Sequence, residues 1–400
     1  MAKIKGLLRK ICHKILGKRP VTKDAFLVEV VHQNAVLDEL RATLSELKAS
    51  TSVIQNHVIR LHDAIPATIM PELDQIHART TRLVENDMDS RRSLYADLAR
   101  GLHRSIAEME SLVDSDPVRV VFITDGNYLQ ATTVAITSLL RHRRCDVKVE
   151  VNVIGVGLSD SEAAKFNVFG SAVNLVKVAN RYADRFARHR HVSEAALLKF
   201  DLPSLFLDYD KILYLDGDLL ILDDLGELWR TPLEDCCAAV VKDYAAYLNG
   251  AHPQRIGHKD YFNSGVMLLN LDLFRRVGMS ERLLEIKNND PVPGAFMDQT
   301  AFNVAFDENV KYVSPKFNMM RCNNRRWAPS IHHISHFYDL SVKDFAAMSE
   351  FPVVLHLTNI MKPWSSRSAP GWEQWQDEAN VLQAMEELMA KEIPCVISST

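Results

Sequence analysis

Two carboxylates interrupt an apolar stretch near the middle of the chain. The segment KILYLDGDLL, residues 211–220, places Asp216 and Asp218 on either side of Gly217. One interpretation is structural, because Asp-Gly between strand-like segments is a strong signal for a β-hairpin turn. The other is chemical, because two carboxylates at the end of a strand supply hard oxygen ligands for a divalent metal ion. The choice between them depends on the rest of the chain.

Four further segments place polar side chains in apolar surroundings. Taken alone, each residue has a structural explanation as a helix cap, a turn residue or a buried histidine. Together they supply what a nucleotide diphosphate site requires: carboxylates and an imidazole for one divalent ion, a lysine for phosphate, and polar groups for sugar and base. An imidazole ligand favours Mn²⁺ over Mg²⁺. The residues are Asp125, Asn127 and Tyr128 in VVFITDGNY, Asn263 in DYFNSGVMLLNLDLF, Asp298 and Gln299 in GAFMDQTAFNVAF, and His356 and Lys362 in FPVVLHLTNIMKPW.

The elements that must position these residues are strands alternating with helices over residues 116–366. VRVVFIT, VKVEVNVIG, AVNLVKV and DKILYL are short apolar runs, and the helical pattern LQATTVAITSLLRHR follows the first of them. Continuous apolar strands of this kind predict an α/β fold with a mostly parallel sheet covered on both faces. Ligands of such sheets bind at the carboxyl ends of strands, where Asp125 and Asp216 lie. This arrangement favours the metal interpretation over the hairpin.

The other regions are predicted to be helical. Residues 1–19 combine seven lysines and arginines with apolar residues at helical spacing, which predicts an amphipathic helix on an anionic membrane surface; a basic tail or a helix docked on a partner is the alternative. Residues 20–115 carry heptad-like apolar spacing and one glycine, which predicts a coiled coil for homo-oligomerisation, with an intramolecular helical hairpin as the alternative. Residues 367–400 predict a helical tail that packs on the preceding domain.

Composition limits the class of protein. The formal net charge of −4 argues against a general nucleic-acid-binding protein. The six cysteines form no C-x-x-C pair, which is typical of free thiols in a reducing compartment. No apolar run reaches the roughly 18 residues of a transmembrane helix, and the basic N-terminus lacks the apolar core of a secretory signal. We therefore expect a cytoplasmic protein, peripherally attached to the cytoplasmic face of the membrane through residues 1–19.

The ordered motifs resemble those of glycosyltransferase family 8 from about Val118 to Trp364. The resemblance rests on VVFITDGNY, LLKFDLPSLF followed by KILYLDGDLLIL, YFNSGVMLLNL, MDQTAFN and HLTNIMKPW in this order. A lone D-x-D is a weak signal, whereas the ordered set is specific. The family includes bacterial lipooligosaccharide galactosyltransferases and glycogenin. The resemblance implies a GT-A, Rossmann-like fold and retaining transfer of a hexose from a nucleotide sugar, usually UDP-galactose or UDP-glucose.

The resemblance also implies roles for individual residues. Asp216, Asp218 and His356 would be the metal ligands. Gln299 would lie nearest the reacting carbon on the acceptor side; since an amide is a poor nucleophile, attack from the face of the departing group is favoured. Asp298 and Lys362 would complete the catalytic group, and the donor-binding residues would be Asp125, Asn127 and Tyr128 around uridine, Asn263 at the sugar, and Lys199, Asp216, Gly217, Asn359 and Lys362 in the rest of the donor site.

Two positions depart from the family pattern. The family usually has an arginine where this chain has Leu197, and a glycine where it has Asn359. Asparagine is the next best residue at positive φ, so Asn359 is compatible with a close backbone approach to phosphate. Leu197, in contrast, removes a usual contact to the donor, for which Arg181 or Arg185 could substitute.

Three functions follow from these patterns. The first is a Mn²⁺-dependent, or Mg²⁺-dependent, retaining hexosyltransferase that acts on a glycan or glycolipid acceptor of the cell envelope. The second is a coiled-coil scaffold carrying a domain that binds sugar nucleotides but is inactive, for which Leu197 is the main support. The third is a metal-dependent phosphohydrolase, which explains the carboxylates but not the ordered motifs.

Overall fold

The chain divides between Asp87 and Met88 into two compact units. The unit Met88–Thr400 contains every residue of the predicted site. The predicted helix at residues 1–19 and the heptad pattern before Met70 lie outside the part of the chain that the structure describes. The computed structural model describes residues 70–112, 116–183, 194–249, 260–289, 298–320, 330–358 and 361–392.

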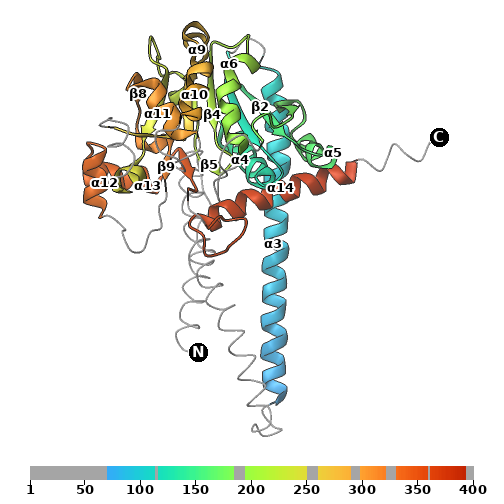
Figure 1. Cartoon of the computed structure of the whole chain (residues 1–400). Coiled ribbons are helices and arrows are strands. Elements are labelled where there is room, and N and C mark those ends of the chain that lie inside the picture. Colours follow the sequence, from blue (N-terminus) through green and yellow to red (C-terminus); the bar gives the residue numbers. More distant parts are fainter. Residues whose placement is uncertain are drawn as a thin grey trace, which may run out of the picture. The chain divides into compact units, whose positions relative to one another are not determined.

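A seven-stranded mixed sheet forms the centre of the unit Met88–Thr400, in the order β3-β2-β1-β4-β7-β6-β8 (Figure 1). The first four strands in this order run parallel to one another, as predicted. The long strand β7 runs antiparallel to both β4 and β6, and β8 is parallel to β6. The bounds are β1 Val118–Thr124, β2 Val149–Val156, β3 Val173–Val178, β4 Lys211–Leu215, β6 Ala238–Lys242, β7 Phe262–Asn270 and β8 Val310–Tyr312.

A second, three-stranded sheet contains β5 (Leu219–Ile221), β10 (Val354–His356) and β9 (Met319–Met320), with β10 in the middle. β10 runs antiparallel to β5 and parallel to β9. Because β4 belongs to the large sheet and β5 to the small one, Asp216-Gly217-Asp218 connects two sheets. The hairpin interpretation of this segment is therefore wrong.

Helices cover the large sheet on both faces. Alternate residues of each strand point to opposite sides, so each strand contributes apolar side chains to both cores. In β1, Val120 and Phe122 belong to one hydrophobic core, and Val121 and Ile123 belong to the other. The first core includes α4 and α14, and the second includes α9, α10 and α11. The longer helices are α3 Met70–Glu110, α4 Leu129–His142, α9 Leu271–Val277, α10 Met279–Asn288, α11 Gln299–Phe306, α12 Ile331–Phe337, α13 Val342–Glu350 and α14 Trp372–Glu392.

Short helices fill the connections, and local sequence signals explain where several elements begin and end. Ser159 and Glu162 form a reciprocal capping box that starts α5. Gly278, with a left-handed φ of 62°, ends α9 and separates it from α10. The short elements are the α-helices α5 Asp160–Ala163, α6 Leu202–Leu205, α7 Gly226–Trp229 and α8 Tyr244–Asn249, and the 3₁₀ helices η1 Ala164–Ala172, η2 Glu194–Asp201 and η3 Pro315–Phe317.

The last turns of α3 belong to the compact unit Met88–Thr400 rather than to a separate helical region. Ala99, Leu102, Ile106 and Met109 are buried in the core that also holds β1 and β2. The compact unit therefore begins at Met88, whereas the sequence analysis places the start of the domain at residue 116. In the same way α14 packs against α4 through buried side chains such as Met385, so residues 372–392 are part of this unit too.

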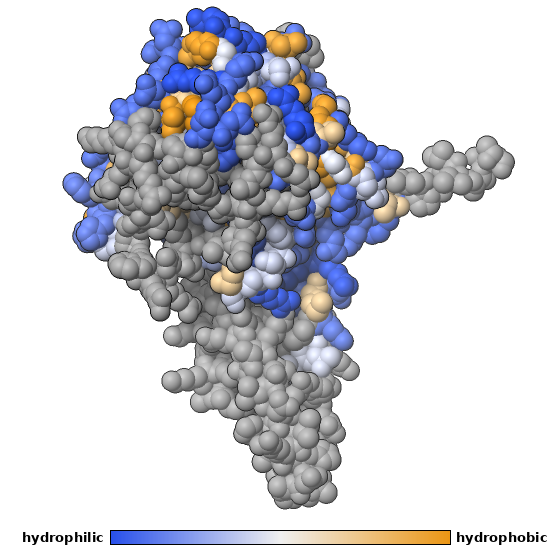
Figure 2. Space-filling view, viewed as in Figure 1, coloured by the Kyte–Doolittle hydropathy of each residue, from blue (hydrophilic) through white to orange (hydrophobic). Residues whose placement is uncertain are grey.

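The described surface carries no large apolar region on the face seen in Figure 2, where hydrophobic residues form small, separate groups among hydrophilic ones. None of the helices within the described ranges combines the length and the apolar character that crossing a bilayer requires.

Candidate active site

Asp216, Asp218 and His356 converge at one point, although they come from distant parts of the sequence. One potential ligand atom from each lies within 4.8 Å of the others. Asp216 follows β4, Asp218 precedes β5, and His356 is the last residue of β10. The backbone fixes this arrangement, because the amide of Leu357 donates to the carbonyl of Asp218 at 3.0 Å. The small sheet therefore brings the imidazole to the carboxylates.

Gly265 of β7 allows the three side chains to approach one another. A Cβ atom at this position would lie 2.3 Å from Cε1 of His356 and 2.8 Å from Oδ2 of Asp216. Both distances are shorter than any van der Waals contact, so no larger residue fits without displacing a proposed ligand. The carbonyl of Gly265 also accepts a hydrogen bond of 2.8 Å from the amide of Asp216.

The hydrogen bonds around His356 show that this group of residues suits a cation. Asn318 donates through Nδ2 to Oδ1 of Asn263 at 3.0 Å, so its own Oδ1 is the acceptor for Nδ1 of His356 at 2.9 Å. With the proton on Nδ1, the Nε2 lone pair points toward Oδ1 of Asp218, 3.3 Å away. A metal ion bound between this lone pair and the carboxylate would satisfy both groups, and two carboxylates with one imidazole are suitable ligands for a divalent ion.

Lys362 places a positive charge next to the carboxylate of Asp218. Its Nζ lies 2.5 Å from Oδ2 of Asp218 and donates to the carbonyl of Leu357 at 2.7 Å. Burial would raise the pKa of Asp218, but the charge of Lys362, with a smaller contribution from the contact with His356, outweighs it and holds this pKa well below its usual range. Asp218 is therefore ionised throughout the physiological pH range.

Lys199 connects Asp216 to Asp298. Its buried Nζ lies 3.0 Å from Oδ1 of Asp216 and 2.6 Å from Oδ2 of Asp298. Burial alone would lower the pKa of Lys199, yet the two carboxylates raise it above its ordinary value. Tyr214 donates to the same oxygen of Asp216 at 2.7 Å, and Ser264 donates to Asp298 at 2.8 Å. The position of Lys199 is thus that of a structural cation between two acids.

A chain of amide hydrogen bonds surrounds Gln299. Its Nε2 donates to Oδ2 of Asp243 at 2.9 Å, and its Oε1 accepts from Nδ2 of Asn263 at 3.2 Å. Asn263 in turn accepts from Asn318, which reaches His356. The sequence analysis missed Asp243 and Asn318. Asp243 directly follows the apolar run CCAAVVK, so its place at the end of a strand could have been recognised from the sequence. Asn318 follows a short turn, and no pattern in the sequence marks it.

A comparison with protein families identifies the chain. Residues 119–368 match the model described as glycosyl transferase family 8, which is more than half of the sequence. The chain belongs to glycosyltransferase family 8. It is therefore a glycosyltransferase, and the α/β GT-A fold that the sequence predicted is confirmed.

This glycosyltransferase is similar to several bacterial proteins and to plant ones such as "Probable galacturonosyltransferase-like 6" of Arabidopsis thaliana, which is 28% identical over 50% of this chain and 64% of that protein. It is 22% identical to "General stress protein A" of Bacillus subtilis, over 63% of this chain and 88% of that protein. It is 25% identical to "Lipopolysaccharide 1,2-glucosyltransferase" of Escherichia coli, over 69% of this chain and 80% of that protein. The crystal structure of the galactosyltransferase LgtC in complex with donor and acceptor sugar analogs is similar with a TM-score of 0.55 and 26% identity, over 65% of this chain and 95% of that one.

The residues predicted to line the uridine pocket of the glycosyltransferase lie in the turn between β1 and α4. Asp125 accepts through Oδ1 from the amides of Asn127 and Tyr128 at 3.0 and 3.1 Å, which fixes the turn. The ring of Tyr128 packs edge-to-face on Trp364, with centroids 5.7 Å apart. Burial, followed by the charge of Asp218, raises the pKa of Tyr128 above its ordinary value, so the phenol is neutral and close to the carboxylates.

The remaining residues that the sequence singled out in this glycosyltransferase have different surroundings. At Gly217 a Cβ would lie 2.4 Å from Oγ1 of Thr132 in α4, so glycine is required there. Leu197 is fully buried in the core between the sheet and α9–α11. Arg181, one candidate to replace the family arginine, pairs with Asp201 at 3.0 Å. Asn359 and the other candidate, Arg185, lie outside the described residues.

Proposed function

We propose that this glycosyltransferase is a metal-dependent retaining hexosyltransferase. It moves galactose or glucose from a UDP-sugar to a glycan or glycolipid acceptor in the synthesis of cell-envelope polysaccharide or lipopolysaccharide. The observation that carries the proposal is the convergence of Asp216, Asp218 and His356 beside Lys362. The similarity to a lipopolysaccharide glucosyltransferase and to a galactosyltransferase that binds donor and acceptor analogs supports it.

The leaving group of this reaction is a nucleoside diphosphate, on which negative charge develops as the glycosidic bond breaks. A divalent ion, Mn²⁺ or Mg²⁺, held by Asp216, Asp218 and His356 would neutralise this charge as a Lewis acid. Lys362 adds its own positive charge next to Asp218. No protein group has to protonate the leaving group, so the reaction needs positioned cations rather than a strong general acid.

The buried residues beyond the metal ligands hold the sugar in place. Gln299 cannot reorient freely, because Asp243 and Asn263 fix both ends of its amide. Asp298 is held by Lys199 and Ser264. Oriented in this way, the side chains bind the sugar while the acceptor hydroxyl attacks the anomeric carbon from the face that the diphosphate leaves. The C–O bond to the diphosphate breaks as the new one forms, and the hydroxyl proton passes to the departing phosphate oxygen.

Two further proposals rest on the sequence alone. Residues 1–19 would attach the protein to the anionic cytoplasmic face of a membrane, which would place the active site near lipid-linked acceptors. Of the predicted region 20–115, the part that precedes the compact unit, residues 20–87, would form a homo-oligomer through a coiled coil.

Release of UDP tests the proposed reaction. We expect the purified protein to release UDP from UDP-galactose or UDP-glucose only with Mn²⁺ or Mg²⁺, and faster with a suitable glycan acceptor. Binding of UDP without turnover across donors and acceptors would favour the inactive scaffold instead. Free hexose or inorganic phosphate as the sole product, whatever acceptor is present, would favour the hydrolase.

A further inference from the structure

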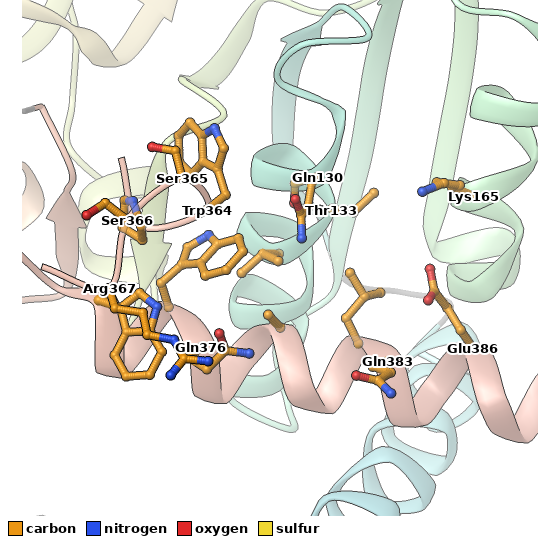
Figure 3. A pocket seen from close by; sticks show the side chains of 16 residues that line it. Gln130, Thr133, Lys165, Trp364, Ser365, Ser366, Arg367, Gln376, Gln383 and Glu386 are labelled. Carbon is orange, nitrogen blue, oxygen red and sulfur yellow. Dashed lines mark hydrogen bonds between the residues drawn. The ribbon is translucent and has the colours of Figure 1, made fainter. Parts of the chain in front are cut away.

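A cavity of about 700 Å³ lies between α4, α14 and the loop that follows β10, apart from the candidate active site. Figure 3 shows its walls: Gln130 and Thr133 come from α4, and Gln376, Gln383 and Glu386 come from α14. Residues 364–367 of the loop close one end, and Lys165 stands at the other. The volume lies in the range of about 300–1,000 Å³ that is usual for small-molecule sites. None of the residues assigned above to catalysis or to donor binding lines it.

Three of the five tryptophans in the chain line this cavity, which we call the tryptophan pocket. Trp364 and Trp375 lie against each other with ring centroids 6.1 Å apart, and the guanidinium of Arg367 lies 5.7 Å from the ring centroid of Trp372. Aromatic planes next to amides and charged groups offer an apolar face together with hydrogen-bond partners. The pocket therefore suits a ligand that has both apolar C–H faces and many hydroxyl groups.

The indole N–H of Trp375 is an unsatisfied donor in the wall of the tryptophan pocket. The residue is 4% exposed, and its Nε1 is buried and has no hydrogen-bond partner within the described part of the chain. Buried indole N–H groups usually have an acceptor, because leaving one unpaired costs about 1–3 kcal/mol. An indole nitrogen only donates, so an acceptor such as a ligand hydroxyl would pair with it once a neighbouring side chain shifts and exposes Nε1.

We propose that the tryptophan pocket is a carbohydrate-binding subsite that holds a sugar unit of the acceptor glycan at a distance from the reacting hydroxyl. The charges of Lys165 and Arg367 are partly offset by Glu386, so the lining is only weakly basic and accommodates a neutral sugar. Gln376 and Gln383 each use their Nε2 within α14, toward Asn380 and Glu387, which leaves their Oε1 atoms to accept from sugar hydroxyls.

Trp364 links this pocket to the donor site. One edge contact joins its ring to Tyr128, and Nζ of Lys362 lies 5.8 Å from its centroid. The ring thus stands between the tryptophan pocket and the residues proposed to bind the nucleotide. A glycan that occupies the pocket is held on the same molecule as the active site, which raises the effective concentration of its reacting end. Sugar binding itself is independent of the proposed function, whereas its assignment to the acceptor rests on that function.

Binding is measured without donor, on the full-length protein, with defined α- and β-linked glucose and galactose oligosaccharides of one to six units. Tryptophan fluorescence and the indole N–H signals in NMR spectra report on the pocket. We expect at least one series to give a saturable change that strengthens with chain length, and the Trp375 signal, assigned by its loss in Trp375→Phe, to shift. Trp372→Ala and Trp375→Phe should weaken this binding about 5- to 10-fold. The matched control Gln374→Ala is exposed on the same helix outside the pocket and should bind as the wild type does.

Trp375→Phe also has a stability readout. It removes an unpaired buried donor while keeping an aromatic ring, so its melting temperature without sugar should not fall by more than a few degrees. If no oligosaccharide shifts the Trp375 signal, or if both tryptophan variants bind as the wild type does, the subsite does not exist.

Kinetics separate this proposal from the proposed function. With an active enzyme, Trp372→Ala should lower kcat/KM for long acceptors about 5- to 10-fold more than for a monosaccharide acceptor. An equal loss for both would overturn the assignment to the acceptor. A protein that binds oligosaccharides through the pocket but never releases UDP would refute only the proposed function.

Discussion

The donor site and the tryptophan pocket share Trp364 as a neighbour but are built in different ways. In the donor site, hydrogen bonds run from Asp243 through Gln299 and Asn263 to Asn318 and His356. In the tryptophan pocket, aromatic surfaces form much of the wall, and a buried N–H lacks a partner among the described residues. A hydrogen-bond network fixes the positions of its side chains, and the loss of one member disturbs the others. Aromatic surfaces instead contribute to ligand binding in smaller, separate amounts. Substitutions in the two regions should therefore differ in size as well as in kind.

The largest effect is expected at Asp218. Asp218→Asn keeps the shape of the side chain but removes the negative charge that pairs with Lys362 and faces Nε2 of His356. UDP release at saturating Mn²⁺ should fall by about 10³-fold or more, because the site can no longer hold the ion and the lysine in place. The matched control is Asp223→Asn, at an exposed carboxylate just after β5, which should remain active. Residual activity within tenfold of the wild type in Asp218→Asn would show that this carboxylate is not a ligand.

The second prediction concerns the stability of the network. Lys199→Met leaves Asp216 and Asp298 without their shared cation, and losing one partner of a buried ion pair typically costs about 3–5 kcal/mol. Urea denaturation at pH 7 should show this loss of unfolding free energy. Lys177→Met, which breaks an exposed pair with Asp160, should change it far less. Equal effects of the two variants would mean that the buried pairs contribute no more than a surface contact.

The third prediction tests the hydrogen bond behind the imidazole. Asn318→Ala removes the acceptor of His356 Nδ1 but leaves the three proposed ligands in place. Affinity for Mn²⁺, measured by electron paramagnetic resonance titration, should fall about 10- to 100-fold, as is usual when such supporting bonds are lost. Asn309→Ala, whose side-chain amide donates to the backbone carbonyl of Asp235 at 3.0 Å and to none of the proposed ligands, serves as the control. Unchanged affinity in Asn318→Ala would mean that His356 is oriented by packing alone.

The smallest effect is expected behind the tryptophan pocket, at the α14–α4 contact. Burial raises the pKa of Glu378 to about 7, although Arg141 lies 2.7 Å from its carboxylate. The folded protein therefore holds this proton more tightly than the unfolded chain does. The resulting stabilisation is present below about pH 4.5 and is lost as the pH rises to about 7.

Glu378→Gln removes this titration. The melting temperature of the variant relative to the wild type should increase between pH 5 and pH 8, by a few degrees at most. Glu373→Gln, at an exposed glutamate of the same helix, should give a difference that does not change with pH. A constant difference for Glu378→Gln as well would show that its carboxyl titrates normally.

The sequence predicted the parallel half of the sheet well but not the other half. β1 to β4 are short runs rich in apolar residues and are separated by helices. Few folds other than a parallel α/β sheet fit that pattern. β7 is equally apolar, yet an apolar run does not reveal strand direction, so its antiparallel pairing with β4 and β6 was not predicted. The apolar face at the end of α3 showed that residues such as Leu102 need a partner, but not that the catalytic core supplies it.

The sequence likewise predicted only part of the candidate site. The three metal-ligand candidates were found because carboxylates and a histidine at strand ends are unusual in apolar surroundings. The supporting residues were harder to find, since Tyr214, Ser264 and Asn318 are ordinary residue types whose role depends on which strands become neighbours. Their positions follow from β7 and β9, whose pairings are long-range properties of the fold.

The pairing of β10 with β5 has a consequence for protein synthesis. Asp216 and Asp218 leave the ribosome long before His356, which lies 138 residues beyond Asp218 in the chain. At about 5–20 residues per second, translation takes roughly 7 to 28 s to cover this distance. During that interval the nascent chain has both carboxylates but lacks β10, which ends in His356, and Lys362, which follows it. The candidate metal site is therefore completed late, so a truncated translation product that ends before β10 would have both carboxylates but not His356.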